Sequence, residues 1–89
     1  MYARATTHRA PPADVEEAIV HYEDGIPSLR EIAGNRGAIL LVDRSAGKAI
    51  GITLWESDEA MRRADELRQQ PAQESGEVDE YEVAVWAVS

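Results

Sequence analysis

The sequence predicts a ferredoxin-like α+β fold, in which a four-stranded antiparallel sheet carries two helices on one face. Three observations predict it. The chain has 89 residues, so we expect a single domain over residues 1–89. Stretches that alternate like strands are interspersed with stretches of helical period, in the order β-α-β-β-α-β. Right-handed βαβ crossovers then place both helices on the same side of the sheet.

The first half of the chain predicts a strand followed by a long helix. Residues 1–9 alternate in chemistry, and Pro11 ends the strand because proline lacks the amide that a sheet ladder needs. Residues 14–33 repeat apolar side chains every three or four positions behind an acidic first turn, which is typical of an amphipathic helix. We expect Pro27 to bend or split this helix and Gly34 to end it.

The second half predicts a hairpin, a second helix and a last strand. Ser57 is expected to cap the second helix and Pro71 to stop it, with a further helical turn left open over residues 71–75. The expected ranges are 37–44 and 49–55 for the hairpin strands, 58–70 for the helix and 78–88 for the last strand.

Three of the expected strands are apolar on both faces, which two helices on one side cannot cover. Ile52 and Leu54 lie on the side opposite Thr53 and Trp55. A wide exposed apolar sheet face is not typical of a soluble monomer. We therefore expect a second copy of the chain to cover it in a twofold homodimer, with Ile52 and Leu54 in the interface.

Composition and charge exclude several partners. The chain has 9 basic and 17 acidic residues, a net charge of −8, which argues against nucleic acid and anionic membranes. It has no cysteine and only two histidines, His8 and His21, so we expect no metal site. Neither a signal peptide nor a membrane-spanning apolar run is recognisable, and a cytoplasmic protein is expected.

A resemblance to a known family rests on segments spread over the whole chain. They are Met1-Tyr2-Ala3-Arg4, Ile26-Pro27, Gly34-x-x-Gly37, Leu41-Val42-Asp43-Arg44 and Thr53-Leu54-Trp55-Glu56-Ser57-Asp58-Glu59-Ala60. With them the sequence resembles the antibiotic-biosynthesis-monooxygenase-like family of the dimeric α/β-barrel superfamily. The resemblance implies a dimer whose two sheets face each other and a ligand cavity between sheet and helices. Activities known in the family are cofactor-independent oxygenation of polycyclic phenols and oxidative heme breakdown.

The resemblance also implies that Trp55 points toward the helices. Alternation puts Gly51 and Thr53 on the same side, and we assign Ala3 of the first strand to that side too. Small residues there predict a substrate cavity, unless the aromatic side chains fill the space themselves. The predicted cavity has Trp55, Tyr22 and Tyr81 as its walls and Ala3, Gly51 and Thr53 as its floor.

The same alternation puts Arg4 on the opposite face, inside the expected barrel. A buried arginine needs an acidic partner. Glu82 comes close to register with Arg4 if the last strand runs antiparallel beside the first. We therefore expect Arg4 to pair with Glu82, or with another acid, across the dimer interface.

Heme breakdown is not expected. For that activity the resemblance implies a tryptophan on the third strand, an asparagine on the first and an axial histidine on the second helix. Trp55 matches the tryptophan. However, Ala3 stands at or beside the asparagine position, and residues 58–70 contain no histidine to bind iron. No cofactor is therefore expected.

Two functions remain open from the sequence. In the first, the protein is a cofactor-independent monooxygenase-like enzyme for an aromatic or polyketide-like molecule. Trp55 would stack on the substrate, Tyr22 or Tyr81 would donate a hydrogen bond to an oxyanion, and His21 would act as a base if it turns inward.

In the second, the protein is a non-catalytic, homodimeric small-molecule-binding or stress-associated protein of the same fold. A sealed core around Trp55 would favour this function, whereas an open cleft with converging hydroxyls would favour the enzyme. His8 and the many carboxylates are expected at the surface. The sequence identifies neither a substrate nor a catalytic residue.

Overall fold

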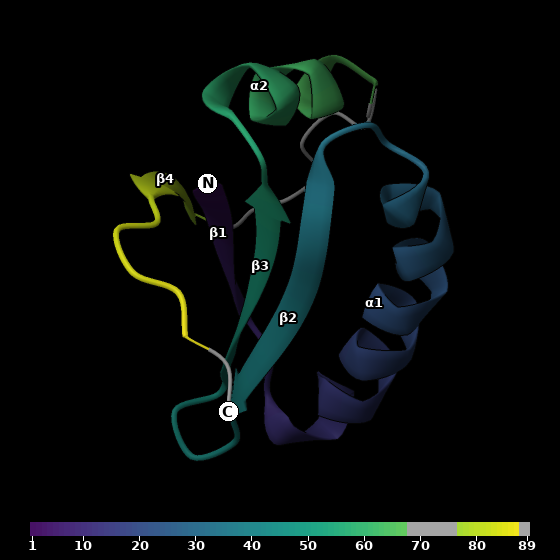
Figure 1. Ribbon diagram of the computed structural model, residues 1–89. Helices are drawn as coiled ribbons and strands as arrows, with labels where there is room; N and C mark the ends of the chain where they lie inside the picture. The colour runs from purple at the N-terminus through teal and green to yellow at the C-terminus, as the bar shows by residue number, and fades with distance from the viewer. Residues whose placement is uncertain (68–76, 88–89) are drawn as a thin grey trace.

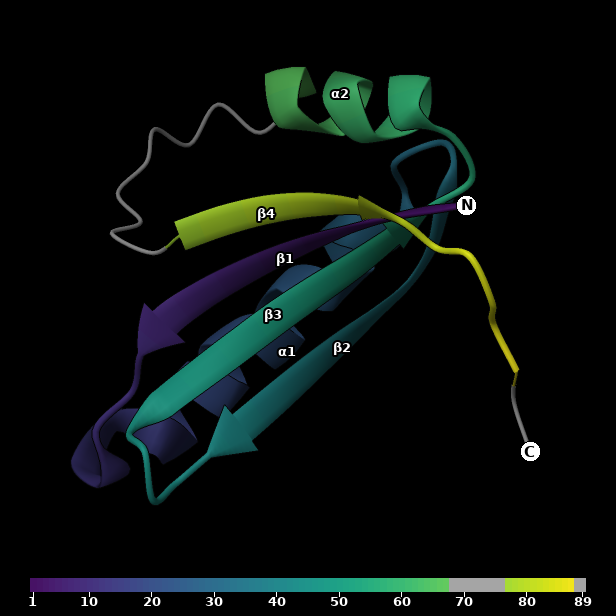
Figure 2. The same ribbon diagram turned by 90° about the vertical axis from the view of Figure 1, so that its left-hand side faces the viewer.

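The computed structural model confirms the ferredoxin-like α+β fold, with a four-stranded antiparallel sheet in the order β2-β3-β1-β4. It describes residues 1–67 and 77–87. Figures 1 and 2 show α1 lying along the sheet and α2 across one end of it. The elements are β1 (Tyr2–Arg9), the 3-10 turn η1 (Pro12–Asp14), α1 (Val15–Arg30), β2 (Asn35–Asp43), β3 (Lys48–Trp55), α2 (Asp58–Leu67) and β4 (Glu77–Glu82).

Helix α1 differs from the expectation in its interior and at its end. Pro27 lies inside a single helix that ends at Arg30, so the helix is not split and stops three residues short of position 33. One proline removes only one backbone hydrogen bond, which a packed helix can tolerate. Gly34 then adopts a φ of 90° where the chain turns toward β2. Its carbonyl oxygen accepts a hydrogen bond of 2.8 Å from the Glu56 N–H.

Helix α2 begins as predicted. The Ala60 N–H donates to Ser57 Oγ at 3.1 Å, which confirms Ser57 as the cap. Ala60, Met61 and Ala64 turn their side chains to the sheet and are buried against Trp55. The expected end of this helix at residue 70, its stop at Pro71 and the turn over 71–75 lie outside the described residues.

The register of β1 corrects the predicted face of its residues. Arg4 lies opposite Thr53, and Thr6 lies opposite Gly51. Directly opposite residues of an antiparallel pair share a face, so Arg4 faces the helices and Ala3 faces away from them. The prediction was wrong because alternation within one strand fixes which residues go together, whereas only pairing with a neighbour fixes which side they take.

Strand β4 ends earlier than expected. It stops at Glu82, and a hydrogen bond of 2.8 Å from the Val83 N–H to the Met1 carbonyl oxygen closes its ladder with β1. β4 lies at the sheet edge and pairs with β1 alone, so its ladder can extend only as far as β1 does. Residues 83–87 continue without strand structure and carry the exposed Val85 and Trp86.

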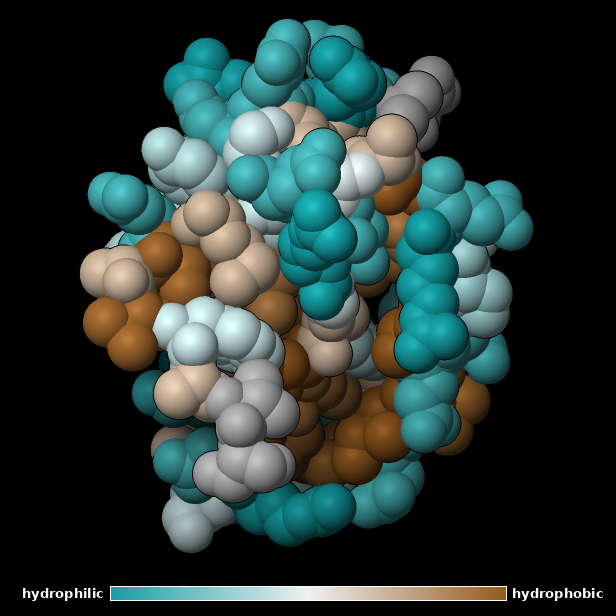
Figure 3. Space-filling model, in the orientation of Figure 1, coloured by the Kyte–Doolittle hydropathy of each residue, from teal (hydrophilic) through white to brown (hydrophobic). Residues whose placement is uncertain are grey.

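The sheet face opposite the helices remains apolar. By register it carries Ile39 and Leu41 of β2, Ile50 and Ile52 of β3, and Tyr81 of β4. Leu41 and Tyr81 are 48% and 57% exposed. Figure 3 looks at the sheet from its side rather than onto this face, and shows apolar side chains between and around the polar surfaces of α1 and α2. The homodimer that would cover this face stays a prediction.

Candidate functional site

A cleft of about 470 Å³ opens between the first half of α1 and the helix-facing side of the sheet. Strands β1, β2 and β3 form its floor, while η1 and α1 form its wall. We call it the imidazole cleft, because both histidines of the chain line it. Its lining residues are His8, Arg9, Ala10, Asp14, Glu17, Ala18, His21, Tyr22, Leu40, Ala49 and Gly51.

The floor is apolar and set by small residues on β3. Ala49 and Gly51 are buried, and Leu40 lies opposite Gly51 on β2. Tyr22 reaches down from α1 to close one end. Its hydroxyl lies 3.1 Å from the Ile39 carbonyl oxygen and 3.2 Å from that of Ile52, and it donates its proton to this pair. The Tyr22 hydroxyl is therefore engaged with the backbone rather than directed at the cleft.

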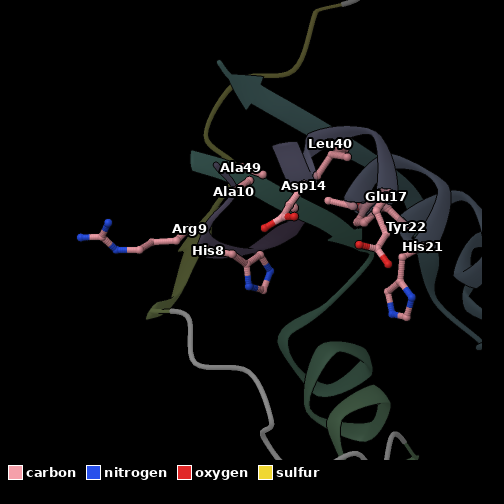
Figure 4. A pocket seen from close by; sticks show the side chains of 11 residues that line it. His8, Arg9, Ala10, Asp14, Glu17, His21, Tyr22, Leu40 and Ala49 are labelled. Carbon is pink, nitrogen blue, oxygen red and sulfur yellow. The ribbon is translucent and has the colours of Figure 1, made fainter. Parts of the chain in front are cut away.

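The mouth of the cleft carries its titratable groups. His8 lies opposite Ala49 in the β1–β3 register, which turns its half-buried ring to the helix side. Glu17 and His21 are four residues apart on α1 and so lie on one side of that helix. Figure 4 shows the Asp14 and Glu17 carboxylates and both imidazole rings gathered around the cavity.

These groups do not form a metal centre. In residues 1–67 and 77–87, no three His, Asp or Glu side chains converge closely enough to hold a metal ion. The chemistry that the cleft offers is proton transfer by imidazole, which is the side chain best suited to exchange protons near neutral pH.

The structure places Trp55 in the hydrophobic core rather than in a cavity. Its side chain is 2% exposed and packs with Met61 and Ala64 of α2. Its Nε1–H donates to Thr53 Oγ1 at 2.9 Å, so Thr53 serves as a partner of the indole instead of a cavity floor. The space that the sequence assigned to a substrate around Trp55 is filled by α2.

Two other predicted site residues lie on the opposite side of the sheet. Ala3 and Tyr81 face each other across β1 and β4, on the face away from the helices. Of the predicted set, Tyr22 and Gly51 alone line the imidazole cleft. That all these residues share one cavity was therefore wrong, because Ala3 and Tyr81 lie on the other face of the sheet and α2 fills the space beside Trp55. Whether any of them contacts a ligand stays a prediction.

Arg4 has a different partner from the one predicted. It forms an ion pair with Asp65 of α2, beneath that helix. Glu82 lies opposite Tyr2 in the β1–β4 register, and Glu80 lies opposite Arg4. Because Arg4 faces the helices, it does not lie on the expected dimer face, and the predicted Arg4–Glu82 pair is not formed within this chain. Ile52 and Leu54 do lie on that face, although Leu54 is already buried.

Sequence reasoning missed that His8 lines a cleft and missed the position of that cleft. The available signal was the alternation of β1, which groups His8 with Arg4 and Thr6. Choosing the correct face for that group would have placed His8 beside Ala49 and Gly51. Among the described residues, no helix is long and apolar enough to cross a membrane.

A comparison of amino-acid sequences identifies relatives of this chain among known proteins. No protein-family profile matches the chain. Uncharacterized protein Rv2558 of Mycobacterium tuberculosis is 48% identical over 63 residues, which cover 70% of this chain and 27% of that protein. Uncharacterized protein Rv2557 of the same organism is 36% identical over an alignment of 92 residues, covering 94% of this chain and 41% of that protein. The chain thus spans between a quarter and a half of the length of these relatives.

A comparison with solved structures identifies the fold of this chain. The heme-degrading protein Rv3592 of Mycobacterium tuberculosis superimposes with a TM-score of 0.78 at 20% identity, covering 98% of each chain. The ActVA-Orf6 monooxygenase of Streptomyces coelicolor, in complex with nanaomycin D, superimposes with a TM-score of 0.70 at 18% identity, covering 99% of this chain and 92% of the other. The chain has the antibiotic-biosynthesis-monooxygenase-like fold. At these identities the comparison establishes this fold and leaves the reaction to be argued from the cleft.

Proposed function

We propose that the chain binds a planar phenolic molecule in the imidazole cleft and oxygenates it with molecular oxygen, without a cofactor of its own. The observation that carries the proposal is a cleft with an apolar floor of Leu40, Ala49 and Gly51 and two imidazoles at its mouth. An apolar cavity with few polar groups is the usual form of a small-molecule site. A neighbour of the same fold, the ActVA-Orf6 monooxygenase, binds nanaomycin D.

The proposed reaction uses the substrate as its own source of electrons. His8 or His21 takes a proton from the activated ring CH₂, and the resulting phenolate of the enol form passes an electron to O₂ to give a substrate radical and superoxide. The two combine through a new C–O bond at the same carbon, which now carries one hydrogen, and the imidazolium returns the proton to the peroxide to give a hydroperoxide. Loss of water then leaves a ring carbonyl. One oxygen atom of O₂ stays in the product, and the other leaves in water with the two hydrogens of the CH₂ group.

The residues of the cleft suit a phenol better than heme. The Asp14 and Glu17 carboxylates would repel the propionates of a heme. Helix α2, on which the family resemblance implies an axial histidine, has none between Asp58 and Leu67. The buried Trp55 also leaves no opening beneath α2 for a macrocycle. The proposal therefore excludes heme degradation even though heme degraders share the fold.

A second candidate is a non-catalytic small-molecule-binding protein. It is favoured by the sealed core around Trp55 and by the Tyr22 hydroxyl, which is already bonded to backbone carbonyls. In that case the imidazoles contribute hydrogen bonds to a ligand that leaves unchanged. Both candidates use the same cleft, so binding alone does not separate them.

We propose further that two copies pack together through the face of the sheet opposite the helices. The apolar side chains of Ile39, Leu41, Ile50 and Ile52 on that face support it, because a second sheet would remove them from water. A twofold arrangement brings the same patch of both copies together. The cleft, on the helix side, stays open in such a dimer.

Oxygen uptake tests the catalytic proposal. The substrate is a hydroxylated anthrone, whose ring CH₂ is activated by the ketone of the same ring, and calorimetry measures its binding separately. We expect uptake of one O₂ per molecule of ketone formed, with the rate reduced at least about tenfold by His8→Gln or His21→Gln while binding persists. Glu23→Gln, on the same helix outside the cleft, is the matched control. Saturable binding without uptake would establish the non-catalytic candidate, and the absence of binding to any phenolic polycycle would overturn both.

A further inference from the structure

The charges at the mouth of the imidazole cleft restrict the class of ligand. Resting on the proposed function, we infer that the phenolic ligand carries a protonated amine, and that the Asp14 and Glu17 carboxylates bind this ammonium group at the mouth. The ring system would then lie on the floor formed by Ala49 and Gly51, with its phenol near the imidazoles.

The two carboxylates are free to receive a cation. Both residues are exposed and both line the cleft. Within the described part of the chain, neither forms an ion pair or a side-chain hydrogen bond. Asp14 stands at the N-cap position of α1 and makes no capping hydrogen bond. A ligand would therefore displace no ion pair and no side-chain hydrogen bond of either carboxylate.

The nearby positive charge does not neutralise them. Arg9 also lines the cleft, but Figure 4 shows its guanidinium extending away from the cavity and from both carboxylates. Arg44, another cation near the start of α1, is held by Glu16 at 3.0 Å. The mouth therefore presents two negative groups, within a chain whose net charge is −8. Such a mouth favours a cation and disfavours a carboxylate on the same ring system.

Three matched probes test this inference. They are naphthols that carry an aminomethyl, a hydroxymethyl or a carboxyl group at the same ring position, and calorimetry measures the affinity of each. For the wild-type chain we expect the ammonium probe to bind about fivefold tighter than the neutral one, and the carboxylate probe to bind more weakly than either. The difference should shrink in high salt, because exposed charges are then screened.

Two double variants locate the effect. Asp14→Asn with Glu17→Gln removes the two carboxylates from the mouth, and we expect the three probes to bind with nearly equal affinity. Glu23→Gln with Asp24→Asn makes the same change of net charge on exposed positions of α1 outside the cleft. This control should keep the wild-type order of affinities. The single Glu17→Gln variant, expected to lose part of the discrimination, replaces the first double variant if that one does not fold.

The outcomes separate this inference from the proposed function. Equal binding of all three probes to the wild-type chain would overturn the ammonium site while leaving a phenol-binding cleft. Equal loss of discrimination in both double variants would also overturn it, because overall charge would then be the cause. If no probe binds, the proposed function fails together with the inference.

Discussion

Tyr22 occupies the space above Gly51. A Cβ added at position 51 would lie 3.0 Å from Cε1 of the Tyr22 ring, closer than side chains normally approach. The hydroxyl of the same ring is bonded to the carbonyl oxygens of Ile39 and Ile52, so the ring cannot retreat without losing those bonds. The absence of a side chain at Gly51 therefore makes room for the tyrosine that joins α1 to the sheet and closes one end of the cleft.

This relationship predicts the effect of Gly51→Ala. The new methyl group pushes Tyr22 away from the sheet, and we expect the free energy of unfolding to fall by about 1–3 kcal/mol, the usual cost of overpacking. Urea denaturation measures it. Gly25→Ala is the matched control, because nothing lies within 4 Å of an added Cβ there. In that exposed part of α1 the change should stabilise the protein by about 0.5–1 kcal/mol. Equal effects at the two positions would contradict the packing described for Tyr22.

Trp55 should behave as a core residue. Because its side chain is 2% exposed, Trp55→Ala should lower the free energy of unfolding by about 3–5 kcal/mol. Trp86 is 53% exposed, so Trp86→Ala should change that quantity by less than about 0.5 kcal/mol in a monomer. Thermal and urea unfolding compare the two variants. If the Trp55→Ala protein is as stable as the wild type, Trp55 lines a cavity and is not a core residue.

The Arg4–Asp65 ion pair should hold α2 on the sheet. The side chain of Arg4 is 19% exposed, so removing the Asp65 carboxylate takes a negative charge away from a poorly hydrated guanidinium. We expect Asp65→Asn to lower the free energy of unfolding by about 1–3 kcal/mol. Glu56→Gln breaks the exposed pair with Arg36 and should change it by less than about 1 kcal/mol. If the two substitutions have the same small effect, Arg4 does not depend on Asp65.

The homodimer predicts a mass of twice 9.8 kDa in light scattering at micromolar concentration. Leu41→Lys, which places a charge on the apolar sheet face, should shift the population to monomer. Val20→Lys serves as a control, because Val20 is similarly exposed but belongs to α1. A wild-type chain that is monomeric and well folded at this concentration would contradict the dimer.

The sequence was sufficient for the order of the elements but not for the face of β1. Helical periods and the Ser57 cap are local signals that the structure reproduces, whereas α1 ends at Arg30, ahead of the predicted end at Gly34. The side on which Ala3, Arg4 and His8 lie depends instead on pairing with β3, which is set by packing between distant segments. Because the sequence analysis chose the wrong face for β1, it placed Ala3 in the predicted cavity. For the same reason it did not identify His8 as a residue that lines the observed cleft.

The sequence also did not show that side chains would fill the predicted cavity. Small residues at positions 51 and 53 allow either a pocket or a close approach. The structure shows close approach at Gly51, by Tyr22, while Thr53 accepts the hydrogen bond of the Trp55 indole. Both contacts depend on how closely side chains pack onto the sheet, which no periodic pattern specifies.

We propose that a phenolic ligand binds in the imidazole cleft and not beside Trp55. An NMR titration of the wild-type chain with 1-naphthol tests it most directly, because the two histidine rings and the two indole N–H groups give separate signals. We expect saturable shifts of the His8, His21 and Tyr22 ring signals, with the Trp55 indole N–H signal unmoved. A saturable shift of the Trp55 indole N–H signal, with both histidine rings unchanged, would contradict it.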